Sequence, residues 1–205
     1  MLSIPLVYWR INMKLTKLFI LLVLVSILPL SAQCEPDSIA SLEVCVIKTN
    51  YGDMQFMFFE DAAPLTVDKF KNLVNNGFYD SLTFYRVAKD HVIQAGDGGE
   101  NDIPTVVAEF NEYPHVVGTV GLARSTDPNS GSTEFYICLI PRPHLDGKYN
   151  VFGQLMEGYE VLEEIGNTEI VEQFVGEEKN IAFHTPKEPV IILKATIETI
   201  NNFVK

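Results

Sequence analysis

Two polar residues in neighbouring β-rich runs are the candidates for chemistry in this sequence. Arg86 follows the aromatic pair Phe84 and Tyr85, and Gln94 lies in the next run along the chain. An arginine stays charged and offers a fixed fork of donors, so it can stabilise electron density that develops on a substrate atom. Taken alone, Arg86 could equally be a surface residue whose stem packs on apolar neighbours. The surrounding sequence has to decide between these interpretations.

Other kinds of chemistry find less support. Gly96-Asp97-Gly98-Gly99 is not followed by the Lys-Ser/Thr pair of a phosphate-binding loop, so we interpret Asp97 as a turn residue. No Cys-x-x-Cys or Cys/His spacing typical of a zinc site occurs. The formal net charge is -12, with acidic residues spread along the chain, whereas nucleic-acid binding needs clustered Lys and Arg. We therefore expect neither a metal nor a nucleic-acid partner.

The elements that would position Arg86 and Gln94 are mostly short strands. Turn-rich stretches at 96–102, 125–132 and 141–150 separate many of them. Many short strands between such turns predict a barrel or a sandwich, and a barrel pairs its own edge strands. The β-rich runs are 42–48, 54–59, 83–87, 92–95, 106–110, 119–123, 134–139, 151–155 and 190–197.

Two helices are predicted between these runs. In the first, Thr66 is the expected N-cap and Asn76-Gly77 the end, with apolar residues at helical spacing between them. The second ends at Gly166-Asn167. Both are amphipathic and could cover the open ends of a barrel. Their apolar positions are Val67, Phe70, Leu73 and Val74 in the first, and Tyr159, Val161, Leu162 and Ile165 in the second.

Three segments carry a more specific signal. The first is Phe84-Tyr85-Arg86-Val87, continued by His91-Val92-Ile93-Gln94-Ala95-Gly96-Asp97. The second is Gly121-Leu122-Ala123-Arg124, continued by Asn129-Ser130-Gly131-Ser132-Thr133-Glu134-Phe135-Tyr136-Ile137. The third is His144-Leu145-Asp146-Gly147-Lys148-Tyr149-Asn150-Val151-Phe152-Gly153. In this order they resemble the F-H-R-I-I-P-G-F-M-x-Q-G-G-D, S-M-A-N, N-G-S-Q-F-F-I and W-L-D-G-K-H-V-V-F-G segments of the cyclophilin family, with Ala63-Pro64-Leu65-Thr66 at the family's V-P-K-T.

The resemblance spans about Leu42 to Ile200 and is greatest to bacterial members, which share one extra residue in the second segment. It implies a mainly β fold, a closed eight-stranded antiparallel barrel capped by two α-helices. It also implies a peptidyl-prolyl cis/trans isomerase that needs no cofactor and binds proline-containing segments of unfolded or flexible proteins. Its proline pocket would lie on the outer face of the barrel.

The family's site residues carry over by position. Arg86 and Gln94 are implied as catalytic. The implied substrate-binding residues are His91, Val92, Ala123, Arg124, Glu134, Phe135, Tyr136, His144, Leu145 and Tyr149. Several depart from the family pattern: His91 and Val92 replace Phe and Met, Glu134 replaces Gln, Tyr136 replaces Phe, His144 replaces Trp or Phe, and Tyr149 replaces His. Binding of cyclosporin-type ligands is therefore expected to be weakened.

The chemistry that this site would perform breaks no bond. The barrier to rotation about a peptide bond, about 18–20 kcal/mol, is the loss of amide resonance. X-Pro bonds relax uncatalysed in tens of seconds or longer, so catalysis in milliseconds needs a factor of about 10⁴, or roughly 5.4 kcal/mol. The twisted proline nitrogen exposes a lone pair, which Arg86 could bind selectively. One charged hydrogen bond supplies about 1.5–3 kcal/mol, and the apolar pocket and backbone contacts would supply the rest.

The first 33 residues differ in composition from the rest. They hold no acidic residue, and an apolar run from Leu18 to Leu30 follows Lys17. That run is shorter than the roughly 20 residues of a membrane span but fits a secretory signal, with Leu30-Ser31-Ala32 at the cleavage point. We expect a signal peptide at 1–33, with 1–12 as an extension before a start at Met13. The isomerase domain is expected at 34–205 in a periplasmic or otherwise exported protein.

Two questions remain open from the sequence. An uncleaved signal, or lipidation of Cys34, would hold the protein at a membrane. Cys45 and Cys138 lie in apolar runs where cysteine acts as a small buried hydrophobic residue, although an exported protein could pair cysteines.

The alternative function is a cyclophilin-like peptide-binding chaperone or scaffold with weak or no isomerase activity, because the pocket residues are changed.

Overall fold

The structure is a computed structural model that describes residues 41–99, 102–175 and 181–201; for 173–175 and 181–183 only the backbone is described. The expected signal peptide at 1–33 and Cys34 lie outside the described residues. Residues 39–205 form one compact unit that holds every described element. None of the described helices is long and apolar enough to span a membrane.

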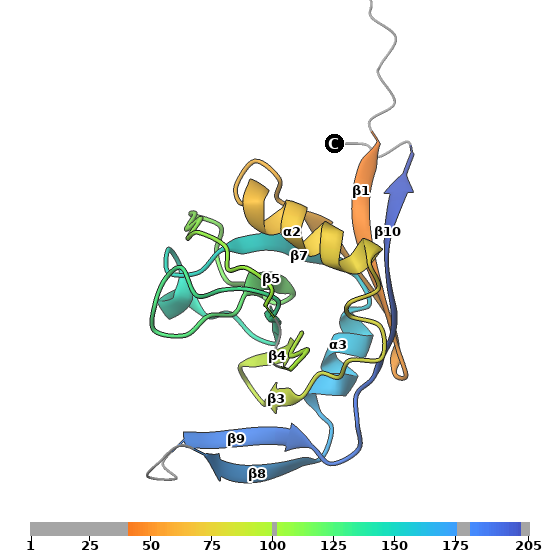
Figure 1. The fold of residues 1–205 in the computed structure, drawn as a ribbon. Coiled ribbons are helices and arrows are strands. Elements are labelled where there is room, and N and C mark those ends of the chain that lie inside the picture. Colours follow the sequence, from red (N-terminus) through yellow and green to blue (C-terminus); the bar gives the residue numbers. More distant parts are fainter. Residues whose placement is uncertain (1–40, 100–101, 176–180, 202–205) are drawn as a thin grey trace, which may run out of the picture. The chain divides into compact units, whose positions relative to one another are not determined.

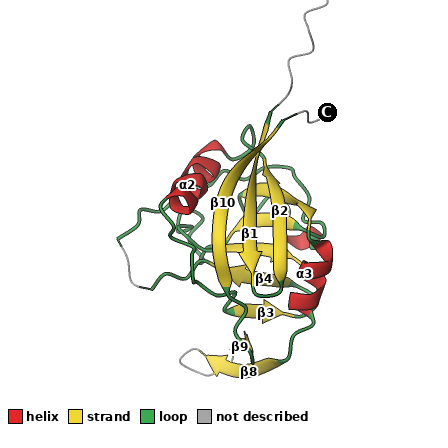
Figure 2. Ribbon diagram, turned by 90° about the vertical axis from the view of Figure 1, so that its right-hand side faces the viewer, coloured by secondary structure: helices red, strands yellow, loops and turns green. Residues whose placement is uncertain are grey.

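Eight strands form one antiparallel sheet, in the order β10-β1-β2-β7-β5-β6-β4-β3. Figure 2 shows its first three strands side by side, and Figure 1 shows the sheet curving away from them through β7, β5 and β4 to β3. The mainly β, eight-stranded prediction is confirmed. The strands are β1 Leu42–Thr49, β2 Gly52–Phe58, β3 Arg86–Ala88, β4 Val92–Ala95, β5 Thr119–Leu122, β6 Phe135–Cys138, β7 Val151–Glu157 and β10 Ile192–Ile200.

The predicted closure of the barrel is wrong, because β3 and β10 do not pair as strands and the sheet stays open. The segment just before β3 lies beside the start of β10 without forming a continuous ladder. Thr83 and Ile191 form an isolated bridge, and the Phe84 N–H donates to the Val190 carbonyl at 2.9 Å. A three-residue β3 is too short to reach further along β10, so irregular backbone fills the seam.

One further expectation about strands is corrected, and one hairpin was not predicted. Residues 106–110 form no strand, because distant groups bind their backbone N–H donors: Val106 donates to the Gly131 carbonyl, and Ala108 donates to Asn129 Oδ1. A hairpin of β8 (Ile170–Val175) and β9 (Ile181–Pro186) forms its own two-stranded sheet. The run at 170–175 does not alternate strictly between apolar and polar residues, so its pattern did not predict a half-buried strand.

The helices lie close to where the sequence predicts them. α2 spans Pro64–Asn75 and α3 spans Tyr159–Gly166, with Asn167 as the C-cap of α3. Phe70 of α2 anchors the core, because its ring packs against aromatic rings from three elements of the sheet. These are Phe56 of β2, Phe135 of β6 and Phe152 of β7, at centroid distances of 5.7, 5.3 and 5.1 Å.

The start of α2 is capped from a distance. Thr66 is not the N-cap; that residue is Ala63, whose side chain offers no hydrogen bond. Instead the Glu109 carboxylate accepts from the Leu65 N–H at 2.9 Å, from the Thr66 N–H at 2.8 Å and from the Thr66 hydroxyl at 2.7 Å. A negative group at a helix N-terminus satisfies free N–H donors and interacts favourably with the helix dipole.

Replacing Glu109 with alanine is expected to lower the free energy of unfolding by about 1–2 kcal/mol, as the loss of an N-cap does. Equilibrium urea unfolding measures this change. Glu112→Ala is the matched control, because Glu112 is exposed on the same loop, and its effect should stay within about 0.5 kcal/mol. Equal unfolding midpoints for the two variants would show that Glu109 does not stabilise the helix.

Cys45 and Cys138 are buried with free thiols. Burial is the main reason that the pKa of Cys138 is raised to about 12, and it raises the pKa of Cys45 as well. A thiol with so high a pKa is unreactive at neutral pH. Both cysteines therefore act as small buried hydrophobic residues, and they do not form a disulfide with each other.

Candidate active site

The two faces of the sheet carry different residues. Along β4 and β6, Ile93, Phe135 and Ile137 point into the main core and are fully buried. Alternate residues point to the outer face, where Arg86 is the register partner of Gln94, and Gln94 is the partner of Tyr136. Three strands thus bring a cation, an amide and an aromatic ring together on the outside of the sheet.

Arg86 and Gln94 are joined by a hydrogen bond. Arg86 Nη1 donates to Gln94 Oε1 at 3.1 Å, and both residues are half-buried. This is the one hydrogen bond of the Arg86 guanidinium to another described residue, and the group has five N–H donors. The bond aims the guanidinium along the outer face and leaves donors available for a substrate.

A second set of bonds orients the Gln94 amide. Gln94 Nε2 donates to the Tyr85 hydroxyl oxygen at 2.6 Å and to Glu134 Oε2 at 2.8 Å, and the Tyr85 hydroxyl donates to the same carboxylate oxygen. Burial and then the bond to Glu134 raise the pKa of Tyr85, so its hydroxyl stays protonated. Both amide N–H groups of Gln94 are thereby occupied. The remaining lone pair of Gln94 Oε1 is the group that can accept from a substrate backbone N–H.

An apolar cluster lies next to this polar group. Val92, Tyr136 and Cys138 are buried together, and Ala123 and Tyr149 pack against them from outside. Tyr136 and Tyr149 meet edge to face at 5.8 Å. Tyr136 is 5% exposed and Val92 is 3% exposed, so little of this apolar surface is open to a ligand. A proline ring could reach it only after Tyr149 or Ala123 moves aside.

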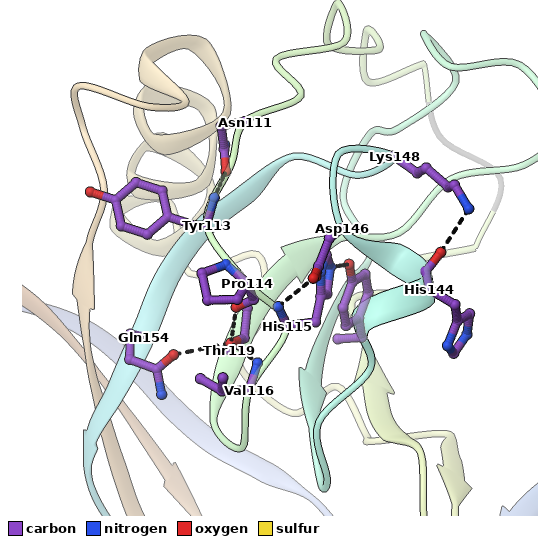
Figure 3. A network of polar contacts seen from close by, with 11 residues as sticks. Asn111, Tyr113, Pro114, His115, Val116, Thr119, His144, Asp146, Lys148 and Gln154 are labelled. Atoms are coloured by element: carbon purple, nitrogen blue, oxygen red, sulfur yellow. Dashed lines mark hydrogen bonds and ion pairs between the residues drawn. The ribbon is translucent and has the colours of Figure 1, made fainter.

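The Tyr136 hydroxyl belongs to a buried network that sequence reasoning did not find; Figure 3 shows His115 and Asp146 of this network. His115, 1% exposed, contacts the Tyr136 hydroxyl through Nε2 at 2.8 Å and Asp146 Oδ1 through Nδ1 at 2.8 Å. Burial lowers the pKa of His115, against the opposing effect of Asp146, so the imidazole is neutral at pH 7. A carboxylate only accepts, so Nδ1 carries the proton and Nε2 accepts from the Tyr136 hydroxyl.

Gly121 makes room for that hydroxyl. A Cβ at position 121 would lie 2.3 Å from both Cζ and the hydroxyl oxygen of Tyr136, closer than real Cβ atoms approach. The cyclophilin S-M-A-N segment has Ser at this position and Phe at the position of Tyr136. In this chain glycine and tyrosine occur together, and the polar end of the tyrosine is turned inward. Tyr136 therefore presents only its ring to the outer face, as a phenylalanine would.

Arg124 borders a cavity of about 340 Å³, lined by Gln94, Ala123, Arg124, Ser125, Ser130, Ser132, Thr133 and Glu134. Its guanidinium lies over the Tyr149 ring at 4.5 Å, and Nη2 donates to the Lys148 carbonyl at 2.8 Å. The structure thus places four of the predicted site residues around one hollow beside the apolar cluster. Most of its other lining residues carry hydroxyl groups, which suits a peptide backbone.

His91 and His144 lie on the other side of the cluster. Their rings are 6.2 Å apart at an angle of 30°. His144 belongs to a 3-10 turn at Pro143–Leu145, and Leu145 is half-buried there. Desolvation first, and then the charges of Arg142, Arg86 and His144, lower the pKa of His91 to about 4. His91 is therefore neutral at pH 7.

This shift predicts that the protein loses stability in acid. The pKa of His91 is about 4 in the folded chain, against 6.5 as its ordinary value, so between these values the unfolded chain binds the extra proton. Stability is then highest above about pH 6.5 and falls as the pH drops towards about 4. Urea midpoints measured at about pH 7 and about pH 4.5 should differ less in His91→Gln than in the wild type. Equal differences would contradict the assignment.

One predicted substrate contact needs correction. Phe135 is fully buried in the main core, where its ring meets Phe70, Tyr79 and Phe84. Neighbouring residues of a strand point to opposite faces, so Phe135 cannot share the outer face with Tyr136. Tyr85 and His115 are the polar residues that sequence reasoning left out. Tyr85 lies within a recognised segment, whereas a single histidine in Tyr113-Pro114-His115 carries no pattern of its own.

Comparison with known proteins agrees with this geometry. The family model described as "Cyclophilin type peptidyl-prolyl cis-trans isomerase/CLD" matches residues 44–197. A "Probable peptidyl-prolyl cis-trans isomerase" of Brucella abortus is 34% identical over 170 residues, covering 75% of this chain and 81% of the relative. A "Peptidyl-prolyl cis-trans isomerase" of Helicobacter pylori is 31% identical over 151 residues, covering 70% and 92%.

Solved structures agree as well. A cyclophilin type peptidyl-prolyl cis-trans isomerase of Cryptosporidium parvum, crystallised in the presence of the dipeptide Ala-Pro, matches with a TM-score of 0.64 and 27% identity. The match covers 76% of this chain and 98% of that one.

Proposed function

This chain belongs to the family of cyclophilin-type peptidyl-prolyl cis/trans isomerases, and from that premise we propose that it catalyses rotation about X-Pro bonds. The observation that supports this most is the group on the outer face: Arg86, held by Gln94, beside the ring of Tyr136. The group combines a fixed cation with an apolar ring, which are the two features that a twisted imide requires.

The catalytic step follows from the electronic structure of the imide. In the planar ground state the proline nitrogen shares its lone pair with the carbonyl and accepts no hydrogen bond. At the twisted state the nitrogen is pyramidal and the lone pair is exposed, so a donor of Arg86 binds the transition state more tightly than either ground state. No nucleophile or base takes part, and the amide bond stays intact throughout.

The other residues hold the substrate while the bond turns. The Gln94 carbonyl can accept a backbone N–H, and the hollow beside Ala123 and Arg124 can take the chain next to proline. The Tyr136 ring would give the proline an apolar surface once Tyr149 moves aside, and the bond to His115 keeps the hydroxyl away from it. Exclusion of water around Arg86 strengthens its interaction with the nitrogen.

Exchange between the cis and trans forms of a short Ala-Pro peptide tests this proposal. NMR exchange spectroscopy with purified protein should show faster interconversion than in buffer alone, without cleavage of the peptide. The protein is used in large excess over any trace inhibitor. A rate equal to the uncatalysed rate would then overturn the proposed activity.

One observation favours a second function, a peptide-binding chaperone with weak or no isomerase activity. Val92 and Tyr136 are almost fully buried beneath Tyr149 and Ala123, which leaves little apolar surface open to a proline ring. Tyr149→Ala separates the two functions, because it uncovers that surface. If the wild type binds peptides but isomerises them slowly, and Tyr149→Ala gains rate without gaining affinity, the chaperone function is favoured.

We also propose that the substrates are exported proteins. Support comes from the composition of residues 1–33, a basic start followed by an apolar run and small residues. Mass analysis of the native protein tests this: the mature chain should begin near Gln33 or Cys34 and be recovered outside the cytoplasm. An uncleaved chain recovered from the cytoplasm would contradict it.

A further inference from the structure

The positive charges of the described chain are unevenly placed. The sequence has 27 acidic and 15 basic residues, so most basic groups should find an acidic partner. All three arginines of the described residues, Arg86, Arg124 and Arg142, nevertheless lie around the candidate site. None of them takes part in an ion pair within the described ranges, where lysines and histidines make all such pairs.

Arg86 and Arg142 share one side of the site with two histidines. Arg142 immediately precedes the 3-10 turn that carries His144, and its backbone N–H donates to the His115 carbonyl at 2.7 Å. His91 lies in the turn between β3 and β4, and its carbonyl accepts from the Leu139 N–H at 2.9 Å. The rings of His91 and His144 are 6.2 Å apart. We name Arg86, His91, Arg142 and His144 the cationic rim, after the charges of its two arginines; His91 is neutral at pH 7.

Two nitrogens of the rim lack partners. His91 Nδ1 and Arg142 Nε are buried, and neither has a hydrogen-bond partner among the described residues. A buried polar atom without a partner destabilises the folded state. Arg142 Nε is always a donor, and His91 Nδ1 becomes one when the ring is protonated or changes tautomer. Because both atoms are buried, the unpartnered nitrogens show that the rim is not internally satisfied, and a ligand would meet the outer guanidinium nitrogens of the two arginines first.

Neighbouring carboxylates form no ion pair with the rim among the described residues. Asp146 is bound by the backbone N–H and the ring of His115, which hold its pKa below the ordinary value. Glu134 accepts from Gln94 and Tyr85. Asp90 is exposed in the turn next to His91. Burial first, and then the charges of Arg142, Arg86 and His144, lower the pKa of His91, and no carboxylate is among these causes.

We propose that the cationic rim is a specificity site for an anionic side chain flanking the substrate proline, either the carboxylate of Asp or Glu or the phosphate of a phosphorylated Ser or Thr. The inference rests on the proposed isomerase function, because Arg86 belongs both to the rim and to the site of rotation. An anion here would accept from the guanidinium groups of Arg86 and Arg142, and its charge would favour protonation of His91. Arginine forks suit both carboxylate and phosphate groups.

A peptide series tests the proposal. Isomerisation rates and dissociation constants are measured at low salt for peptides of one length that carry Ala, Gln, Glu, Lys or phosphoserine, either just before or just after the proline. At one of these positions, the isomerisation rate of the Glu peptide should be at least about 5-fold higher than that of the Gln peptide, and the rate of the Lys peptide should be the lowest. Added salt should reduce the preference. A phosphoserine peptide better than Glu indicates phosphate, and one no better indicates carboxylate.

Two variants locate the effect. Arg142→Gln should bring the Glu-to-Gln ratio close to 1. Lys194→Gln removes the same charge from an exposed position on β10, at the other edge of the sheet, and should leave the ratio unchanged. If active wild-type protein isomerises the Glu and Gln peptides at equal rates, the proposed specificity site is wrong, whereas the proposed isomerase activity stands. If no peptide is isomerised, the isomerase proposal fails, and the dissociation constants for Glu and Gln peptides decide the rim separately.

Discussion

Replacing Arg86 with alanine is expected to lower kcat/KM for X-Pro isomerisation between about 10-fold and about 150-fold. This range is the rate equivalent of one charged hydrogen bond of about 1.5–3 kcal/mol. The bond forms only in the twisted state, because the planar imide nitrogen has no lone pair to offer, so kcat should fall with kcat/KM while peptide affinity changes little. The measurement is NMR exchange or a coupled assay on an Ala-Pro peptide.

Arg86→Lys is the matched control. It keeps the charge but loses the planar fork that donates both to Gln94 and towards the substrate. Its rate should lie between those of the wild type and Arg86→Ala. Unchanged unfolding midpoints in both variants would show that neither loss reflects unfolding. An Arg86→Ala variant as fast as the wild type would remove the proposed mechanism, although the fold and the family would stand.

Replacing His115 with alanine is expected to lower the free energy of unfolding by about 3–5 kcal/mol. The imidazole is buried, so its removal leaves a cavity. The Tyr136 hydroxyl also loses its acceptor, and it packs closely against Gly121 at that point. The partly exposed Asp146 can turn to water and contributes less. Urea or thermal unfolding at pH 7 measures the change.

His144→Ala is the control for this prediction, since it deletes an exposed imidazole from a neighbouring segment and should change stability by less than about 0.5 kcal/mol. Tyr136→Phe removes only the hydroxyl and should cost less than His115→Ala. Combining the two changes should cost less than their sum, because both break the same bond. Additive effects would show that the network contributes no coupling.

The position of a residue within a recognised segment did not predict which face of the sheet its side chain occupies. The resemblance placed Phe135 and Tyr136 together in the substrate site, whereas the strand places them on opposite faces. Because both residues lie in β6, they point to opposite faces of the sheet, although all four residues of this strand are apolar and buried. Similarity across a segment indicates where that segment lies in the fold. The alternation of side chains along a β-strand, with a period of two residues, decides which of them can contact a ligand.

Sequence alone predicted most of the strands, both helices, the family, and Arg86 and Gln94 as the candidate catalytic residues, because these follow from local patterns and from motifs within single segments. Tertiary structure alone decided the cap of α2 by Glu109, the open seam between β3 and β10, and the burial of His115 between Tyr136 and Asp146. All three depend on segments that are far apart in the chain. For the cap and the buried histidine the physical reason is the same: a lone carboxylate or imidazole has no local pattern, and its hydrogen-bond partner is chosen by the packing of distant segments.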